Sequence, residues 1–382
     1  MFDTQTILFA AGGTAGHINP ALSVAGLIRY LHPQCKIHFV GTADHMEARL
    51  VPQAGYAFHT IKISGFQRSF SPESIKRNLG TVKKLLTVTG QVNRLLKEIK
   101  PDLVVGTGGY VSGPVLRAAA KAGIPAAIHE ANAWPGMANK ALAPRMDAVM
   151  LTDMAAAGRM KCKNEPIHTG LPVRPELLRA NRAQSRRALG LDERPMVLST
   201  GGSLGAQAIN EAVSGMIALL CKDCGCCFHH AYGQYGAWMP EKLTKSGVDI
   251  AAPEITLREY IDDMDRCLAA ADLVIGRGGA STVNEIQALG KPAIIIPSPN
   301  VTENHHYYNA KGLADRGAVI LILEKDLTPE LLTKTVKELI ADPARLRAMG
   351  EAAKAGAVTD ANERIYEVLC TLMHNAQCTM HN

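Results

Sequence analysis

The chain has 382 residues, of which 47% are hydrophobic and 20% are charged, with 41 Lys and Arg against 35 Asp and Glu. This composition is typical of a soluble globular protein, and the length is sufficient for two or three domains with cores of their own. It excludes a disordered chain and a small disulfide-stabilised scaffold. No run approaches the roughly 20 apolar residues that a membrane-spanning helix needs.

The first residues, 1–5, lead directly into a strand-like run and lack the basic, apolar and small-residue regions of an export signal. We therefore expect the chain in the cytoplasm, where its nine cysteines would be reduced. One cluster fits either a zinc site or reduced core cysteines beside a buried strand over 226–233: Cys221, Cys224, Cys226, Cys227, His229 and His230. Because no second ligand pair follows at a matching spacing, we favour core cysteines and expect no metal and no cofactor.

In chain order, short β-branched runs alternate with helix-like stretches, which predicts a parallel α/β architecture. The predicted strands are 6–11, 37–41, 103–106, 126–129, 148–151, 196–199, 273–276, 293–297 and 319–323. A proline stands just before several of them, where a preceding helix must already have ended: Pro33, Pro101, Pro125, Pro195 and Pro292.

A strand that runs into a glycine pair occurs four times, twice in each half of the chain: Gly12-Gly13, Gly108-Gly109, Gly201-Gly202 and Gly278-Gly279. This internal echo predicts two similar doubly wound domains, joined near 169–175, where glycine and two prolines suit a hinge. In such sheets ligands bind beyond the carboxyl ends of the strands, so we expect the site in a cleft between the domains.

The glycine turns match neither the spaced dinucleotide fingerprint nor a P-loop. Segments 201–207 and 278–285 bring small and hydroxyl residues to the start of a helix, where unpaired N–H groups favour a phosphate. Glu285 lies one turn into the second helix and has two interpretations. Its carboxylate could accept hydrogen bonds from the two hydroxyls of a ribose, or it could stabilise the helix N-terminus.

Polar side chains in the first half offer acid–base chemistry. His17, at the end of the first glycine turn, could act as a general base near pH 7 or simply bond the backbone of its turn. The run His129-Glu130-Ala131-Asn132 ends another strand of the same half and adds a carboxylate, an amide and a second imidazole. We therefore expect both groups at the same site.

Eight co-linear motifs resemble the MurG family of bacterial N-acetylglucosaminyltransferases in peptidoglycan synthesis: 12–21, 41–44, 108–114, 129–140, 170–174, 201–206, 277–285 and 308–310. The resemblance implies an α/β GT-B fold of two Rossmann-like doubly wound domains with a cleft between them. Residues 1–173 would form the acceptor and membrane-facing domain, and residues 174–357 the UDP-sugar domain. A C-terminal helix at about 358–375 would pack back on the first domain.

The resemblance also implies an inverting transfer of N-acetylglucosamine from UDP-GlcNAc to the C4 hydroxyl of the N-acetylmuramyl residue of undecaprenyl-linked lipid I. The product would be lipid II with a β-1,4 link. His17 is our first choice of general base and Glu130 the alternative. The implied donor-binding residues are Thr14, Ala15, Gly16, Asn132, Arg174, Ser203, Ile261, Ala280, Ser281, Thr282, Val283, Asn284, Glu285 and His306.

Three residues depart from the family pattern. Ala15 replaces a glycine, so its backbone must avoid conformations that only glycine tolerates. Leu171 replaces an asparagine, which we expect to be a mild change. His306 replaces a glutamine, and a neutral imidazole offers at most one donor and one acceptor, so donor affinity is in question. The changes at Ala15 and His306 allow an inactive nucleotide-sugar sensor as one alternative. A second alternative is an isomerase, since UDP-GlcNAc 2-epimerases use a similar two-domain fold and the same nucleotide sugar.

Nine basic residues against two acidic ones fall within 61–100, and the rest of the chain holds 32 basic and 33 acidic residues. Apolar residues at helical spacing in this segment are predicted to face the core. The loop 64–72 instead carries Phe66, Arg68 and Phe70 and is predicted to contact a membrane surface. We therefore expect a peripheral protein on the cytoplasmic face, with the anionic inner leaflet as a partner. Cell-wall synthesis proteins are further candidate partners, and no nucleic acid is expected.

Overall fold

The computed structural model describes residues 2–63, 87–220 and 225–380. The chain divides into two compact units, unit 1 being Met1–Pro172 with Asp360–Asn382 and unit 2 being Val173–Thr359. The membrane loop with Phe66, Arg68 and Phe70 lies outside the described residues, as do Cys221 and Cys224. Within the described ranges, no helix has the length and apolarity that crossing a bilayer requires.

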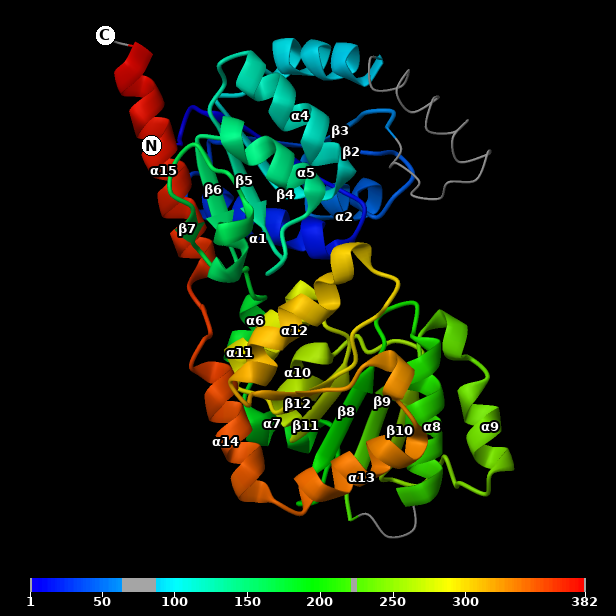
Figure 1. Ribbon diagram of the computed structural model, residues 1–382. Coiled ribbons are helices and arrows are strands. Elements are labelled where there is room, and N and C mark those ends of the chain that lie inside the picture. Colours follow the sequence, from blue (N-terminus) through cyan, green and yellow to red (C-terminus); the bar gives the residue numbers. More distant parts are fainter. Residues whose placement is uncertain (1, 64–86, 221–224, 381–382) are drawn as a thin grey trace. The chain divides into compact units, whose positions relative to one another are not determined.

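Unit 1 is built on a sheet of seven parallel strands in the order β3-β2-β1-β4-β5-β6-β7 (Figure 1). Their bounds are β1 Thr6–Ala11, β2 Lys36–Gly41, β3 Ala57–Thr60, β4 Leu103–Gly108, β5 Ala126–Glu130, β6 Ala148–Leu151 and β7 Ile167–His168. The central strands are continuous apolar runs because helices cover both faces of the sheet.

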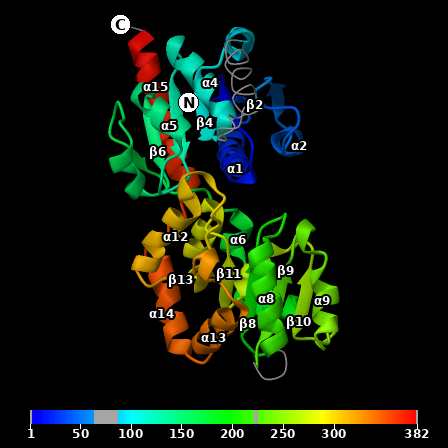
Figure 2. The ribbon, with the colours of Figure 1, turned by 45° about the vertical axis from the view of Figure 1, so that its right-hand side comes forward.

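One face of this sheet packs on α4 (Gly109–Lys121), α5 (Met137–Leu142), η1 (Ala143–Arg145), η2 (Met154–Arg159) and a helix over residues 87–99. The other face packs on α1 (Ala15–Leu31), α2 (Glu47–Gln53) and α15 (Ala361–Met380). The last helix belongs to this unit because Ile365, Leu369 and Met373 are buried in its core, where α15 contacts α1 (Figures 1 and 2).

Unit 2 is built on six parallel strands in the order β10-β9-β8-β11-β12-β13 (Figure 2). Their bounds are β8 Met196–Thr200, β9 Cys227–Ala231, β10 Ile255–Arg258, β11 Leu273–Gly276, β12 Ala293–Ile295 and β13 Val319–Leu321. The buried strand expected within 226–233 is therefore confirmed as β9.

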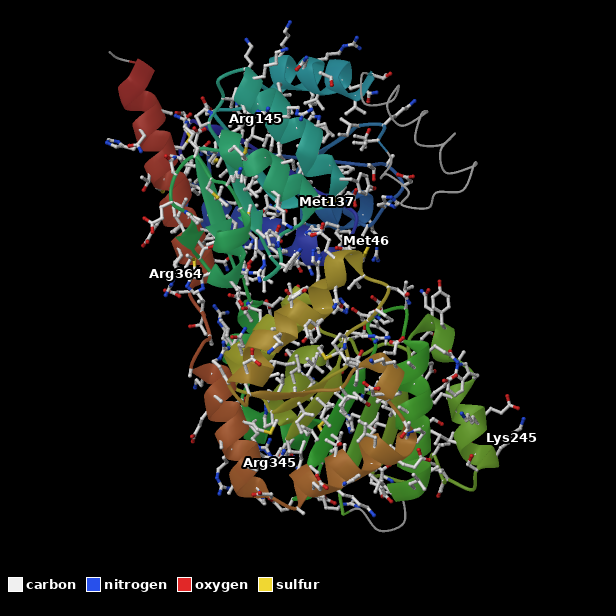
Figure 3. All side chains as sticks on the ribbon, viewed as in Figure 1. Met46, Met137, Arg145, Lys245, Arg345 and Arg364 are labelled. Carbon is white, nitrogen blue, oxygen red and sulfur yellow. The ribbon has the colours of Figure 1, made fainter. Side chains whose placement is uncertain are left out.

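One face of the second sheet packs on α8 (Gln207–Leu220), α9 (Met239–Lys245) and α13 (Pro329–Ile340). The other packs on α6 (Pro175–Arg179), α10 (Met264–Ala270), α11 (Ala280–Leu289) and α12 (His305–Asp315). The remaining elements are α7 (Arg182–Ala188), α14 (Pro343–Lys354), η3 (Gln234–Gly236), η4 (Thr302–Asn304) and η5 (Glu324–Asp326). Charged side chains lie on the outer helix surfaces, as Lys245 does on α9 (Figure 3).

Both sheets repeat the doubly wound order 3-2-1-4-5-6, so the expected Rossmann-like α/β architecture is confirmed. In this order the chain reverses its direction of winding between the first and fourth strands, which are β1 and β4 in unit 1 and β8 and β11 in unit 2. These are the four strands that the glycine pairs follow. The pairs therefore stand at the two positions where doubly wound sheets bind ligands.

Candidate functional site

The two glycine turns of unit 1 interlock backbone to backbone. Gly109 has φ +79°, and a Cβ added to it would lie 2.2 Å from the carbonyl oxygen of Gly12. Only glycine satisfies both conditions, because it tolerates a positive φ and has no side chain to clash. The turn after β1 and the turn after β4 are therefore held in direct contact.

A buried carboxylate, Glu47 at the start of α2, braces the first of these turns. Its Oε2 accepts a hydrogen bond from the Gly13 N–H at 3.1 Å, and its Oε1 accepts bonds from the N–H and hydroxyl of Thr42 at 3.0 and 2.8 Å. The Glu47 side chain is fully buried. Our sequence analysis missed this residue, and the only available signal was a carboxylate soon after the end of a buried strand.

His17 is the third residue of α1, and its Nδ1 lies 3.1 Å from the carbonyl oxygen of Thr107. Since a carbonyl only accepts hydrogen bonds, Nδ1 carries the ring proton and Nε2 keeps its lone pair. No described residue hydrogen-bonds Nε2. Burial lowers the pKa of His17, and the charge of Glu130 and the bond to Thr107 oppose this shift. The imidazole is therefore neutral at pH 7 and presents Nε2 as a base.

Glu130 ends β5 and is buried, with four donors on its two oxygens. Oε1 accepts from the backbone N–H and side-chain amide of Asn132 at 2.9 and 3.1 Å. Oε2 accepts from the Gly136 N–H at 3.0 Å and the Asn139 amide at 2.8 Å. These four donors already occupy both oxygens of the carboxylate. Its geometry suits holding the loop after β5 and stabilising positive charge on His17.

The other unit 1 residues with expected roles lie in the first turn or near it. Thr14 is the exposed N-cap of α1 in an extended conformation, and Ala15 and Gly16 are the first two helical residues. The backbone of Ala15 is therefore helical and avoids the conformations that only glycine tolerates. This is the condition that we set for alanine at a position where the family has glycine. His129 is buried beside Glu130 and lies 2.8 Å through Nε2 from the Gly170 carbonyl oxygen, which ties β5 to the end of this unit.

In unit 2 the turn after β8 places Ser203 on an exposed loop directly before α8. Gly205 has φ +82°, and a Cβ there would lie 2.1 Å from the carbonyl oxygen of Tyr232. This loop therefore packs on the segment after β9. His229 and His230 lie in β9 itself, where burial lowers their pKa values to about 4 and about 3.

The second turn of unit 2 leads from Gly278-Gly279 into α11. Ala280, Ser281 and Thr282 form the partly exposed first turn of this helix, whereas Val283 and Asn284 are each 5% exposed. These two could contact a ligand through their backbone alone. Ile261 is also buried, at 4% exposure.

His306, at the start of α12, packs against the same turn, because a Cβ on Gly278 would lie 2.1 Å from the His306 carbonyl oxygen. Its Nδ1 accepts a hydrogen bond from the Ser298 N–H at 3.3 Å, so the ring proton is on Nε2. Burial, assisted by Arg277, lowers the pKa of His306 to about 4. His306 therefore keeps one donor, Nε2–H, at neutral pH.

Glu285 lies in the middle of α11, and its Oε1 is 3.4 Å from Nη2 of Arg174. The carboxylate side chain is 19% exposed and the arginine 48% exposed. Burial raises the pKa of Glu285, and the positive charge of Arg174 opposes the shift. A partly buried carboxylate with one charged neighbour retains the capacity to accept further hydrogen bonds from a ligand.

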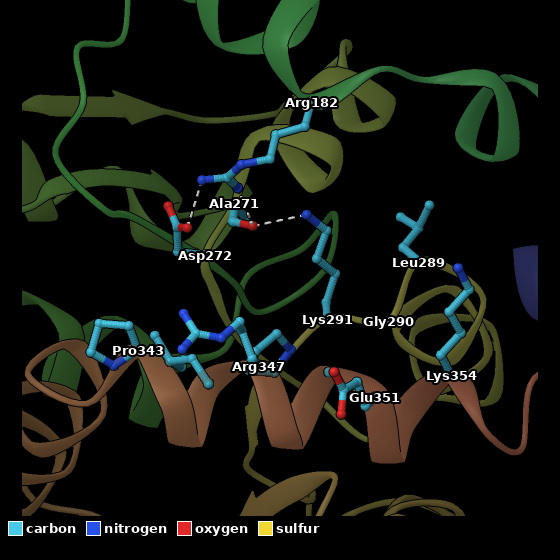
Figure 4. A pocket seen from close by; sticks show the side chains of 13 residues that line it. Arg182, Ala271, Asp272, Leu289, Gly290, Lys291, Pro343, Arg347, Glu351 and Lys354 are labelled. Atoms are coloured by element: carbon cyan, nitrogen blue, oxygen red, sulfur yellow. Dashed lines mark hydrogen bonds and ion pairs between the residues drawn. The ribbon is translucent and has the colours of Figure 1, made fainter.

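A pocket of about 460 Å³ in unit 2 has a different character (Figure 4). Within it, Lys291 Nζ donates to the Ala269 and Ala271 carbonyls at 2.8 Å each, and Arg182 bonds the Ala270 carbonyl and Asp272. These cations stabilise the carboxyl end of α10. Because Asp272 and Pro292 in its lining come directly before β11 and β12, the pocket lies at the amino ends of the strands, away from the glycine turns.

Comparisons with known proteins show the family to which this chain belongs. The glycosyltransferase family 28 N-terminal domain matches residues 7–151, and the family 28 C-terminal domain matches residues 196–365. A relative from Acetivibrio thermocellus is 41% identical over 97% of this chain and 98% of its own length. Its name is UDP-N-acetylglucosamine--N-acetylmuramyl-(pentapeptide) pyrophosphoryl-undecaprenol N-acetylglucosamine transferase.

Among solved structures, MurG from Acinetobacter baumannii superposes with a TM-score of 0.76 at 29% identity, covering 96% of this chain and 99% of that chain. A UDP-N-acetylglucosamine 2-epimerase superposes with a TM-score of 0.68 at 17% identity, covering 99% and 97%. The second likeness shows the shared fold alone. The near-full-length identity to named transferases and the two family 28 domains establish that this chain belongs to the MurG family of glycosyltransferases.

Proposed function

We propose that this enzyme transfers N-acetylglucosamine from UDP-GlcNAc to lipid I and so forms lipid II. The observation that carries the proposal is the 41% identity to a transferase of that name over 97% of the chain. The 2-epimerase alternative rests on a fold likeness at 17% identity, which does not extend to the reaction. A neutral His17 with an open Nε2 argues against an inactive sensor, because it retains the base that the transfer needs.

In the proposed reaction the C4 hydroxyl of the acceptor attacks the anomeric carbon of the donor while the bond from that carbon to UDP breaks. The hydroxyl proton passes to Nε2 of His17, and the new β-1,4 bond replaces an α-linked diphosphate with inversion. Glu130 then stabilises the imidazolium through its charge. Glu130 remains the alternative base rather than the first choice, since four donors already occupy its oxygens.

Negative charge that develops on the departing UDP requires preorganised donors. We assign this role to the backbone of loop 201–206 with Ser203, and to the first turn of α11 with Ala280, Ser281 and Thr282. Helix starts favour phosphate because their N–H groups are unpaired. Glu285 would accept hydrogen bonds from ribose hydroxyls beside Arg174. His306 would donate one bond to the sugar through Nε2.

We further propose that the enzyme docks peripherally on the anionic inner leaflet, where its lipid acceptor resides. The support is the basic segment 61–100, whose loop carries Phe66, Arg68 and Phe70. Replacing Phe66 and Phe70 by serine should lower binding to anionic liposomes in co-sedimentation while UDP binding stays normal. Unchanged liposome binding would show that Phe66 and Phe70 do not contact the membrane.

The transfer itself is tested with labelled UDP-GlcNAc and a lipid I analogue, following UDP release and labelled product together. Transfer yields both, epimerisation yields a new sugar nucleotide, and a sensor yields neither. His17→Ala should lower kcat by about 10²–10⁴-fold, the usual effect of losing a general base, with UDP affinity retained. Near-normal turnover of this variant would move the role to Glu130.

A further inference from the structure

A buried chain of side-chain hydrogen bonds crosses unit 2 behind the first donor loop. It runs from Ser199 in β8 through His230 in β9 to Asn210 in α8 and ends on the Tyr232 carbonyl. We propose that His230 and Asn210 are positioning residues that hold loop 201–206 in the shape that binds the donor diphosphate. This inference rests on the proposed function.

The direction of each bond in the chain follows from its ends. The Asn210 amide nitrogen donates to the Tyr232 carbonyl oxygen at 2.8 Å, which leaves Oδ1 facing Nε2 of His230 at 3.2 Å. Nε2 must therefore carry the ring proton, and Nδ1 accepts the Ser199 hydroxyl proton at 2.8 Å. One tautomer satisfies every member, so the network specifies a single arrangement.

The carbonyl at the end of this chain lies where two loops interlock. A Cβ on Gly205 would lie 2.1 Å from the Tyr232 oxygen, and a Cβ on Gly233 would lie 2.1 Å from the Gly205 nitrogen. The backbone N–H groups of residues 234 and 235 also donate to the carbonyls of residues 203 and 204, at 3.4 and 3.0 Å. Because of these contacts, any interaction that fixes the position of the segment after β9 also fixes the position of loop 201–206.

The Asn210 side chain, through its bond to the Tyr232 carbonyl, holds the segment after β9 against α8. It is 1% exposed, and a Cβ on Gly236 would lie 2.4 Å from its amide nitrogen, so the segment wraps closely around it. His230 is also 1% exposed, and burial lowers its pKa to about 3, so the imidazole stays neutral at any ordinary pH. Removing one member leaves a buried group without its partner, which favours movement of the loop.

The decisive variant is Asn210→Leu, which keeps the side-chain volume and removes both hydrogen bonds. We expect its Kd for UDP, measured by calorimetry well below the unfolding temperature, to rise about tenfold. The KM for UDP-GlcNAc should rise with it, while the KM for the lipid I analogue stays unchanged. A general loss of stability would not weaken affinity for the donor alone, so a loss restricted to the donor distinguishes the positioning role.

The matched control is Lys291→Met, since Lys291 is also buried in unit 2 but bonds carbonyls at the amino ends of the strands (Figure 4). It should lower the melting temperature and leave the Kd for UDP unchanged.

A conservative pair of His230 variants adds a second test. His230→Gln retains a nitrogen donor near the position of Nε2 and should keep UDP affinity, whereas His230→Leu should lose about as much as Asn210→Leu.

Each outcome decides one question. If the wild-type protein fails to bind UDP, the proposed function is wrong. If it binds UDP and Asn210→Leu binds as tightly as Lys291→Met does, the positioning role is wrong. Equal losses in His230→Gln and His230→Leu would also overturn it, because the donor to Asn210 would then be irrelevant.

Discussion

The neutral, buried imidazole of His230 makes the stability of unit 2 sensitive to acid in a way that one substitution should remove. The perturbation is a change from pH 7.0 to pH 5.0, applied to the wild-type protein and to His230→Gln. Glutamine has no titrating group and retains the donor to Asn210. Every other titrating residue is common to both proteins, so its contribution cancels in the comparison.

The size of the effect follows from the difference between the two pKa values. Burial lowers the pKa of His230 from 6.5 to about 3, so the unfolded chain binds a proton here before the folded chain does. The contribution of the neutral His230 imidazole to the free energy of unfolding is fully present above pH 6.5. It is lost as the pH falls from 6.5 toward 3. At about 1.36 kcal/mol per pH unit, the loss at pH 5.0 is about 2 kcal/mol.

The two tryptophans of the chain make the measurement specific to unit 2. Trp134 lies in unit 1 and Trp238 in unit 2, where it packs against the core. In a Trp134→Phe background, urea unfolding followed by tryptophan fluorescence therefore reports unit 2. The free energy of unfolding of the wild-type protein, relative to His230→Gln, should decrease by about 2 kcal/mol between pH 7.0 and pH 5.0. If the difference in the free energy of unfolding between the wild-type protein and His230→Gln is the same at both pH values, the buried and neutral state assigned to His230 is wrong.

Three further predictions concern other parts of the two sites. Glu285→Ala should weaken UDP binding about tenfold by calorimetry, equivalent to about 1.4 kcal/mol, and unchanged affinity would leave Glu285 only a helix-stabilising role. Gly109→Ala combines a φ of +79° with a backbone contact of 2.2 Å and should destabilise unit 1 by about 3 kcal/mol or more, followed through Trp134 in a Trp238→Phe background. Because burial lowers the pKa of His17 in the free enzyme, the acid limb of kcat/KM should lie below pH 6.5, and a midpoint above that value would argue against His17 as the base.

The sequence was sufficient to predict the strands that lie in the middle of each sheet. β1, β6 and β11 begin and end at the predicted residues because their apolar runs are buried on both faces. Predictions failed at three of the four sheet edges, the exception being β13. In β3 two of the four residues are exposed and none is buried, β7 consists of two exposed residues, and β10 is largely half-buried, so none of the three required a long apolar run.

Candidate site residues could be named from the sequence wherever a residue stands on a glycine turn, because the turn itself marks the carboxyl end of a central strand. The residues that hold the turns were not predictable in the same way. Glu47 lies in a helix-like stretch, and His230 belonged to a cluster that fitted either a zinc site or, as we favoured, reduced core cysteines beside a buried strand. Their roles depend on which backbone groups lie opposite them after folding, and that information is carried by the sheet order rather than by local spacing.

The two units solve one physical problem in the same way. Glycine turns allow a backbone to approach a ligand closely, but each ordered residue costs about 1–2 kcal/mol of conformational entropy. Both units meet this cost before any ligand binds, by bonding a buried polar side chain to the loop or to the segment interlocked with it: Glu47 to the Gly13 N–H, and Asn210, supported by His230, to the Tyr232 carbonyl. An apolar core would fill the same space but could not fix the direction of a backbone N–H. Under the proposed function, the polar groups buried behind the turns serve binding rather than folding.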